Sequence, residues 1–568
     1  MYLDSLVKVP EVKGKITYRT KGNTVYVEYE SARVYVPEKR YTTVTRKTIG
    51  KLTDADSKVM QPNENFLKFF PDTVLPEEKD RAQRSCALRA GTWIVIRKIV
   101  NDYNLPEILG RYLPAKDVGL FLDLCAYSIT EEDNRAQHYP SYAYSHPLFT
   151  EGMRIYSDSK VSDFLQSMNR EVSTAFQNDW NRDRNHREKI YISYDSTNKH
   201  CQAGDVEIAE YGHEKERQKK PIFNYSIAYD KNNRLPLFYE AYPGSINDTS
   251  QLQNMLEKAK SYGYRNAGFI LDRGYFSEPN IRFMDRNGFD FILMVKGCKT
   301  LVNELVLRNK GNFEDEWENS IPYYDVNGIT VEDYLFPADE KKRYFHIYYS
   351  DFRKARERAN LQRMIREQKA ALENLKGTED KIDSRSIPYF DLIYHKDKDG
   401  KERLQFVRER KDVISRDIRL CGYFCIISSG KMTAAQALDL YKSRDASEKL
   451  FRGDKSYLGG RSIRTCHDEP TYSKIFIEFV ALIIRNKIYT CLTDRMKEIH
   501  KKKNYMTVPA ALKELDKIEL IRQADGIYKL DHAVTATQKD ILQAFNLTAT
   551  NVRKEAEKIG RELALLSN

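Results

Sequence analysis

The pattern of apolar and polar residues changes twice along this chain. Residues 1–75 hold runs such as TVYVEYESARVYV, rich in β-branched and aromatic residues, and predict strands. Residues 80–180 carry apolar residues at helical spacing, as in DVGLFLDLCAYSIT, and predict helices. From residue 186 onward the pattern predicts a helix at 248–261 and strands at 189–195, 222–229, 236–242, 267–272 and 290–296. The chain is therefore expected to be an α/β protein whose sheet begins with three successive strands.

Two of these predicted strands lead directly into an aspartate. The alternating run KIYISY ends on Asp195, and the short buried run GFIL ends on Asp272. After Asp272, Ser277 is placed as a helix cap, with Pro279 in the first turn of the helix that follows. An aspartate at a strand end is commonly a turn former or a helix cap, so neither residue alone indicates a site.

A third acidic residue lies in the helix-compatible stretch AAQALDLYKSRDASEKLFRGDK, which has no Pro and no Gly before Gly453. At about 100° per residue, Tyr441, Arg444, Glu448 and Lys455 return to nearly the same angle and are predicted to share one face of a single helix. A face with a phenol, a guanidinium, a carboxylate and an ammonium group is poor core material. It suits a site that holds a metal ion and a phosphodiester backbone.

The spacing Y-x2-R-x3-E-x6-K resembles the signature of bacterial insertion-sequence DDE transposases, and so do D-[ST]-T at Asp195 and D-x-G-[FY] at Asp272. The resemblance extends over most of the chain and is weakest at its two ends. It implies a DNA transposase that binds the terminal inverted repeats of its mobile element, cleaves the ends and joins the 3′-hydroxyls to target DNA. It also implies a homodimer in the complex with double-stranded DNA. The residues that it assigns are the catalytic and metal-binding Asp195, Asp272 and Glu448, and the DNA-binding Tyr441, Arg444 and Lys455.

Three carboxylates suit the cleavage of a phosphodiester. Two divalent ions about 4 Å apart activate the attacking oxygen and stabilise the leaving oxygen, and hard oxygen ligands hold such ions. In this interpretation Asp195 bridges two Mg²⁺ ions, Asp272 completes the coordination of one and Glu448 that of the other. Mn²⁺ is expected to substitute for Mg²⁺ because both ions accept oxygen ligands.

Three successive strands, a helix and further strands is the order of a ribonuclease H-like core, and the helix with Glu448 is expected to pack across that sheet. The full prediction is an α/β fold with a ribonuclease H-like mixed-sheet core and a mixed β plus long-helix insertion. The predicted regions are the basic, strand-prone N-terminus 1–75, the helical DNA-binding domain 80–180, the catalytic core 186–299 and 426–495, the insertion 300–425 and the helical C-terminal region 496–568.

Between Asp272 and Glu448 lie 175 residues, far more than one connection requires. Residues 300–425 therefore predict an inserted module, with strand-like pieces and a charged helix from Asp351 to Lys376. That helix is either a solvated hairpin arm or an arm that holds a second subunit or DNA, and the sequence leaves both open. Trp317 is the only Trp of the insertion. Hairpin-forming relatives use such a Trp to hold a flipped base, and its role in this chain is left open.

Composition agrees with a DNA-binding protein, because the net charge is +11 and the pI about 8.9. The longest apolar run, Phe476 to Ile484, is too short to span a membrane and contains Glu478. Eight scattered Cys and no recognisable signal peptide favour a reducing cytoplasm, with the protein associated with the bacterial nucleoid. No G-x4-G-K-[ST] loop occurs, so no nucleotide partner is expected. Two alternatives remain: a ribonuclease H-like DNA nuclease without strand transfer, and a domesticated DNA-binding protein that kept the fold and lost the reaction.

Overall fold

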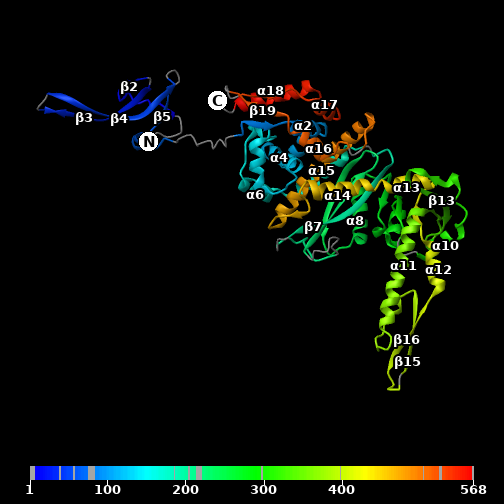
Figure 1. Ribbon diagram of the computed structural model, residues 1–568. Helices are drawn as coiled ribbons and strands as arrows, with labels where there is room; N and C mark the ends of the chain where they lie inside the picture. The colour runs from blue at the N-terminus through cyan, green and yellow to red at the C-terminus, as the bar shows by residue number, and fades with distance from the viewer. Residues whose placement is uncertain are drawn as a thin grey trace. The chain divides into compact units, whose positions relative to one another are not determined.

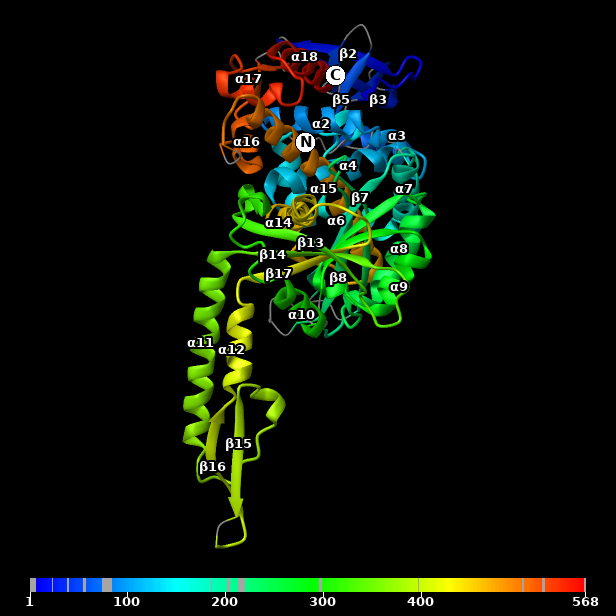
Figure 2. The ribbon, with the colours of Figure 1, turned by 90° about the vertical axis from the view of Figure 1, so that its right-hand side faces the viewer.

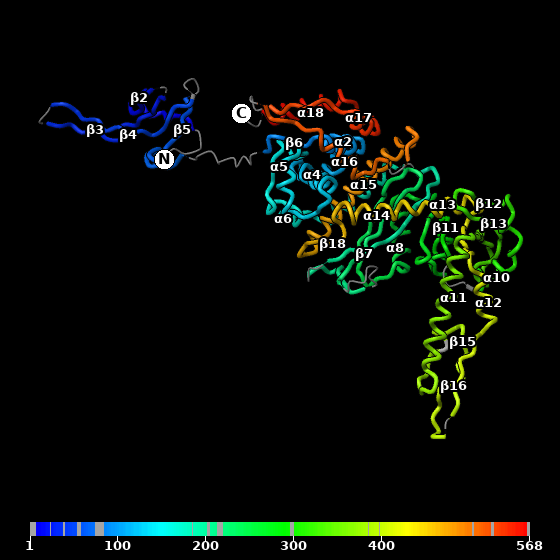
Figure 3. Tube along the Cα trace, viewed as in Figure 1, coloured from blue at the N-terminus to red at the C-terminus, as the bar shows by residue number. Residues whose placement is uncertain are grey.

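The structure is a computed structural model of the chain, drawn as a ribbon in Figure 1 and as a Cα trace in Figure 3. Two compact units, Met1–Arg84 and Ser85–Asn568, are described separately. The described residues are 7–22, 24–37, 40–54, 58–73, 84–184, 186–201, 205–212, 220–295, 299–396, 398–502, 505–523 and 527–565.

In the first unit, the described residues form an antiparallel sheet with the order β1-β5-β4-β3-β2. Its elements are β1 (Val7–Lys8), β2 (Ile16–Lys21), β3 (Thr24–Val36), β4 (Tyr41–Asp54), β5 (Val59–Pro62) and α1 (Glu64–Phe69). The run TVYVEYESARVYV forms β3, as its β-branched and aromatic residues predict. Val27, Ile49, Met60 and Phe66 are buried together, so this unit has an apolar core of its own.

A mixed sheet forms the centre of the second unit, in the order β12-β13-β14-β17-β11-β10-β7-β8-β9, with β18 paired to β7. β7, β8 and β9 are antiparallel neighbours, whereas β10 runs parallel to β7 and β11 parallel to β10. The strands are β7 (Ile190–Cys201), β8 (Ile222–Asp230), β9 (Leu235–Pro243), β10 (Ala267–Leu271), β11 (Asp290–Met294), β12 (Ser320–Ile321), β13 (Val326–Asp333), β14 (Arg343–Tyr349), β17 (Tyr423–Ser428) and β18 (Ser462–Ile463). The five strands predicted between 189 and 296 are present, although residue 296 itself lies outside the described residues.

The sheet continues beyond β11 into the segment predicted as an insertion. β17 pairs antiparallel with β11, β14 with β17 and β13 with β14. The runs KRYFHIYYS and CGYFCIIS predict β14 and β17 as strands, but period-2 alternation does not specify the partner of a strand. Strands from within 300–425 therefore prolong the sheet that carries the first two aspartates.

Between β14 and β17 the chain leaves the sheet as an arm, consisting of α11 (Asp351–Asn374), β15 (Phe390–Lys396), β16 (Glu402–Glu409) and α12 (Lys411–Leu420). Figure 2 shows α11 and α12 side by side, with the β15–β16 hairpin beyond them. Ile365, Leu372 and Val413 belong to a small apolar core between them. At the base of the arm, the N–H of Ser350 donates to the carbonyl of Gly422 over 3.1 Å, so the arm begins and ends at neighbouring points of the sheet.

Helices cover both faces of the sheet. α14 (Asp445–Tyr457) contacts β7, and the hydroxyl of Ser447 donates to that of Ser193. The next residue of β7, Tyr194, points to the opposite face, where its hydroxyl and Gln251 of α8 (Asp248–Ser261) both donate to Glu240. α13 (Ala434–Lys442) packs on β10, β11 and β17, and α15 (Asp468–Glu498) contacts β9.

The remaining helices surround α15 and the sheet, and α2, α4, α6 and α7 contact α15. They are α2 (Gly91–Asp102), α3 (Leu105–Gly110), α4 (Ala115–Glu131), α5 (Tyr139–Ser145), α6 (Asp158–Ser167), α7 (Arg170–Arg182), α9 (Glu278–Arg286), α10 (Lys299–Asn309), α16 (Val508–Leu515), α17 (Ala536–Gln543) and α18 (Ala549–Leu565). β19 (Glu519–Arg522) pairs with β6 (Ala87–Arg89) and β20 (Tyr528–Leu530), which joins the C-terminal region to the first helices. None of the helices in the described parts is long and apolar enough to cross a membrane.

Candidate active site

Asp195 lies inside a strand and not at its end. β7 continues to Cys201, because β8 pairs with it residue by residue from Ile192 to His200, with Asp195 opposite Ile227. The prediction of a strand ending on Asp195 was therefore wrong: cross-strand pairing holds the polar run STNKH in the sheet despite its lack of apolar alternation. The Asp195 carboxylate is 15% exposed and accepts the N–H of Ser196 over 2.9 Å.

Asp272 directly follows β10, as predicted. The parallel register places Leu271 opposite Tyr194, which brings the next residue of each strand, Asp272 and Asp195, to adjacent positions. Beyond Asp272, the short 3₁₀ turn Arg273–Tyr275 leads to α9, and the Ser277 side chain accepts the N–H of Asn280. This confirms the predicted helix cap. The Asp272 carboxylate, 36% exposed, lies at the C-terminal end of β10.

Glu448 lies on α14, but Tyr441 does not, so the prediction of one helix from Tyr441 to Lys455 was wrong. α13 ends at Lys442 and α14 begins at Asp445. At the joint the backbone changes to bonds between residues three apart, from the N–H of Arg444 to Tyr441 and from that of Ala446 to Ser443. This tighter turn alters the angular offset that 100° per residue assumes, and neither Pro nor Gly marks it in the sequence.

The three acidic side chains meet at Arg444. Its Nη2 lies 2.8 Å from Glu448 Oε1, and its Nη1 lies 3.6 Å from Asp195 Oδ2 and 3.5 Å from Asp272 Oδ1. We call these four residues the Arg444 cluster. Burial by itself would lower the pKa of Arg444, but Asp195 and Asp272 outweigh it and raise that pKa. The guanidinium, whose side chain is 19% exposed, is thus a permanent positive charge between carboxylates from three separate elements.

The cluster fits a divalent cation in its chemistry but not in its present arrangement. Within the described ranges, no three His, Cys, Asp or Glu side chains are close enough together to hold a metal ion. The hard oxygens of Asp195, Asp272 and Glu448 nevertheless all face one cationic group, and such oxygens are the ligands that Mg²⁺ and Mn²⁺ take. These three carboxylates would hold the ion, with the guanidinium of Arg444 displaced from between them.

Tyr441 and Lys455 lie on either side of this cluster in the sequence. Tyr441 is 8% exposed and packs with Ile270 and Tyr348, so burial raises the pKa of its hydroxyl. Its ring centre is 5.9 Å from the guanidinium carbon of Arg444. Lys455 is half-buried in the last turn of α14, two turns or about 10 Å along the axis from Glu448. The structure therefore brings Tyr441 to the Arg444 cluster and places Lys455 further along the same helix as Glu448.

A second group of charges, not foreseen from the sequence, lies further along β7. Lys199 Nζ is 2.8 Å from Asp454 Oδ2 of α14 and 2.6 Å from Glu478 Oε2 of α15, with all three side chains at most 2% exposed. We call these three residues the Lys199 cluster. The Asn134 amide also donates to Glu478 over 2.9 Å. The only signal in the sequence was the even spacing that puts Lys199 on the face of Asp195.

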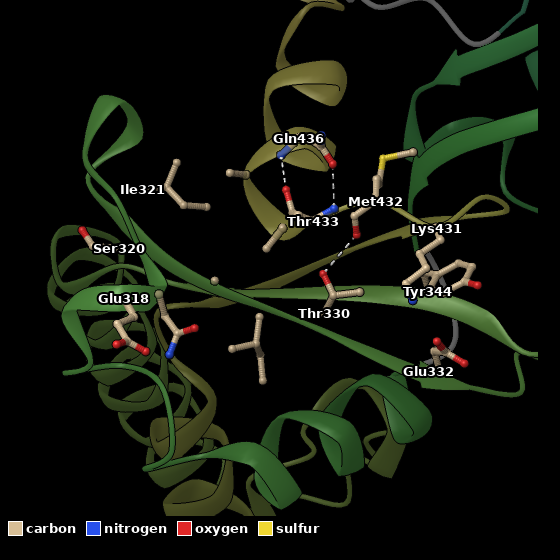
Figure 4. A pocket seen from close by; sticks show the side chains of 15 residues that line it. Glu318, Ser320, Ile321, Thr330, Glu332, Tyr344, Lys431, Met432, Thr433 and Gln436 are labelled. Atoms are coloured by element: carbon tan, nitrogen blue, oxygen red, sulfur yellow. Dashed lines mark hydrogen bonds between the residues drawn. The ribbon is translucent and has the colours of Figure 1, made fainter.

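A cavity of about 740 Å³ lies away from the carboxylates, at the N-terminal end of α13. Figure 4 shows its wall, where the Thr433 and Gln436 side chains cap α13 and Thr330 of β13 donates to the carbonyl of Met432. Lys431 and Glu332 are the charged residues labelled on that side. Trp317, 81% exposed, directly precedes the lining residue Glu318. The role of Trp317 stays open, and none of the carboxylates of the Arg444 cluster lines this cavity.

The chain has counterparts in a known protein family and among solved structures. No curated protein sequence matches the chain. Among solved structures, a chain of the piggyBac transposase synaptic complex with hairpin DNA, determined by cryo-EM, is 10% identical with a TM-score of 0.33. That alignment covers 75% of this chain and 69% of the other. The family model described as transposase DDE domain matches residues 186–484, more than half of the chain and the region that holds the whole Arg444 cluster. The chain belongs to the DDE transposase domain family.

Proposed function

We propose that this chain is a DNA transposase of the Y-R-E-K type. It binds the terminal inverted repeats of its own element, cleaves the element ends and joins the 3′-hydroxyls to target DNA. The observation that carries this proposal is the Arg444 cluster, in which carboxylates from β7, from the end of β10 and from α14 meet at one cationic group. The strand order β9-β8-β7-β10-β11, with α14 across β7, supports a ribonuclease H-like core beneath that cluster.

The proposed chemistry assigns the carboxylates to metal binding. Asp195, Asp272 and Glu448 would hold two Mg²⁺ ions, or Mn²⁺ in their place. When bound, such ions supply Lewis acidity to a phosphodiester and lower the pKa of a coordinated water. The protein contributes position: pairing with β8, opposite Ile227, fixes Asp195 in β7. The parallel register of β10 with β7, which ends at Leu271 and Tyr194, brings Asp272 beside it.

The positive side chains near the cluster are assigned to DNA phosphates. A guanidinium binds phosphate in the same bidentate way as it binds a carboxylate, so Arg444 suits the phosphate next to the cut. We assign Lys455, two helical turns along α14, to a phosphate further along the same DNA strand. Tyr441 is mostly buried, and its role is to support the side chain of Arg444 beside the cut.

The remaining regions are assigned by position. The helices between residues 85 and 180 serve as a DNA-binding domain, the arm contacts DNA or a second subunit, and the active form is a homodimer. Within 300–425, the arm from α11 to α12 leaves the sheet between β14 and β17. We assign the contact with DNA or a second subunit to that arm. A nuclease that cuts without strand transfer would use the same carboxylates. An assay for joining of the 3′-hydroxyl to target DNA distinguishes the two, because only the transposase carries out that step.

The test is cleavage of DNA that carries the inverted repeats flanking the gene. Asp195→Ala, Asp272→Ala and Glu448→Ala are each expected to lower the rate by orders of magnitude, roughly 1,000-fold or more, because each removes a metal ligand. DNA binding is expected to persist, since these variants keep Arg444, Lys455 and the other basic side chains that bind phosphates. Asp445→Ala is the matched control: it removes an exposed carboxylate of the same helix, paired only on the surface with Lys449 at 2.8 Å. Normal cleavage by any of the three variants, or cleavage in excess EDTA, contradicts the proposal.

A further inference from the structure

We propose that Arg444 is a gate on metal binding: it holds the three carboxylates in a metal-free state and releases them when a DNA phosphate takes its guanidinium. Metal and DNA would then bind cooperatively, and the nuclease chemistry would be silent until an element end is in place. This inference rests on the proposed function, because it assigns a regulation to the same site.

The first argument is the balance of charge. Three carboxylates facing one another repel, and Arg444 is the group in contact with all of them. Its side chain is 19% exposed, so these ion pairs are only partly screened by solvent. A metal ion that enters from solution must therefore compete with a positive charge already in the position between its ligands.

The second argument is that Arg444 is held loosely enough to exchange. Only its contact with Glu448, at 2.8 Å, is a hydrogen bond. The distances of 3.6 Å to Asp195 and 3.5 Å to Asp272 are ion-pair separations without the short geometry of a charge-assisted bond. A phosphate offers the planar fork two close oxygens at once, so it can replace these contacts with a bidentate pair.

The third argument is the position of Arg444 in the backbone. It lies at the joint between α13 and α14, where bonds between residues three apart replace regular helical bonds. The side chain therefore leaves a tight turn beside the buried ring of Tyr441 and not the middle of a rigid helix. Reorientation toward DNA requires a change of side-chain rotamers only, while Glu448 stays on the first turn of α14.

Cooperativity follows from linkage. If a phosphate removes Arg444 from the carboxylates, DNA raises the affinity for metal, and metal raises the affinity for DNA by the same factor. Without DNA, removal of the guanidinium should have the effect on metal affinity that DNA has in the wild type. The gate thus predicts a gain of metal binding from the loss of the Arg444 guanidinium, which a purely structural role for Arg444 does not predict.

The experiment measures Mn²⁺ binding by the full chain, from the electron paramagnetic resonance signal of free Mn²⁺. Without DNA, Arg444→Ala is expected to bind Mn²⁺ about 10-fold more tightly than the wild type, within the usual range of coupling between sites. A duplex that ends at an already cut element end should tighten Mn²⁺ binding to the wild type, and should do so less in Arg444→Ala. Lys449→Ala is the control for charge, because it removes one exposed cation from the same helix. Arg444→Ala combined with Asp195→Asn should lose the gain and thereby locate the ion.

The outcomes distinguish failure of the gate from failure of the proposed metal-dependent function. Equal Mn²⁺ affinity for the wild type, Arg444→Ala and Lys449→Ala overturns the gate, and the carboxylates remain the metal site. A gain in Lys449→Ala as large as that in Arg444→Ala also overturns it, since bulk charge then explains the effect. If no form binds Mn²⁺ in a way that Asp195→Asn abolishes, with or without DNA, the proposed function itself fails.

Discussion

The Arg444 cluster and the Lys199 cluster are built from the same two elements and differ mainly in burial. β7 gives Asp195 to the first and Lys199 to the second, four residues later on the same face, and α14 gives a carboxylate to each. Each places one cation among carboxylates. The acidic side chains of the Arg444 cluster are 15% to 53% exposed, whereas all those of the Lys199 cluster are at most 2% exposed. A charge group open to solvent can exchange partners, and a fully buried one cannot.

Burial also changes the protonation of the two clusters differently. Burial raises the pKa of Asp454 to about 6, although the ammonium of Lys199 opposes that shift. The pKa of Lys199 is raised because Asp454 and Glu478 outweigh the burial that would lower it. The Lys199 cluster thus keeps its cation and tends to neutralise one carboxylate. The comparison supports our assignment of the functional role to the Arg444 cluster, which solvent and a substrate can reach, and of a structural role to the Lys199 cluster.

The largest expected difference comes from removing each cation. Lys199→Met leaves two buried carboxylates without their partner, and we expect a loss of about 3–5 kcal/mol in the free energy of unfolding. Arg444→Met, the matched change in the open cluster, is expected to lower it by only about 1 kcal/mol, because the carboxylates left behind are 15% to 53% exposed and solvent screens part of their repulsion. Urea unfolding of the two variants measures both values. Equal losses would break the comparison and make the Arg444 cluster a structural group as well.

The sequence was sufficient for the presence of the five strands between 189 and 296, though not for the end of β7, and for the order of the three carboxylates. The runs before Asp195 and Asp272 and the cap at Ser277 are local features, because alternation and capping depend on neighbouring residues. The resemblance implied that these carboxylates share one site, but their convergence on the guanidinium of Arg444 was not predicted. It depends on the joint between α13 and α14, where no residue with a special backbone preference marks the change.

Two further features could not be predicted from the sequence, for related reasons. Lys199 is fully buried, but a Lys in a polar run is normally exposed, and its partners are 255 and 279 positions away in the sequence. β14 and β17 were recognisable as strands, yet their pairing with each other and with β11 depends on contacts across the arm. Residue alternation predicts a strand but does not identify partners that are distant in the sequence. Both the Lys199 cluster and the extent of the sheet depend on such distant partners.

A smaller effect is expected from pH. The pKa of Asp454 is raised from 3.8 to about 6 in the folded chain. A raised carboxyl pKa gives stability that is fully present below the unfolded pKa and is lost as the pH rises through the folded pKa. Asp454→Asn cannot ionise, so the wild type should lose about 2–3 kcal/mol relative to this variant between pH 4 and pH 7. Urea unfolding of both at each pH gives the difference. A difference that stays constant over this range would show that Asp454 remains ionised in the fold, and the two clusters would then not differ in protonation.

The smallest effect is expected at the contact between α14 and β7 that lies beside the Arg444 cluster. The hydroxyl of Ser447 donates to that of Ser193 over 2.7 Å, and both residues are fully buried between β7 and α14. Ser447 immediately precedes Glu448 and lies two turns before Asp454, so this bond fixes α14 against β7 for both clusters. Ser447→Ala should lower the free energy of unfolding by about 1 kcal/mol, and Ser193→Ala combined with it should recover part of that loss, because no unpaired hydroxyl then remains. Ser456→Ala, at an exposed position of the same helix, is the control and should change little.

Cleavage by Ser447→Ala should fall by less than about 10-fold, since backbone pairing and not this bond positions Asp195 and Asp272. A far larger loss of cleavage at unchanged stability would mean that the packing position of α14 on β7, more than exposure to solvent, distinguishes the Arg444 cluster from the Lys199 cluster.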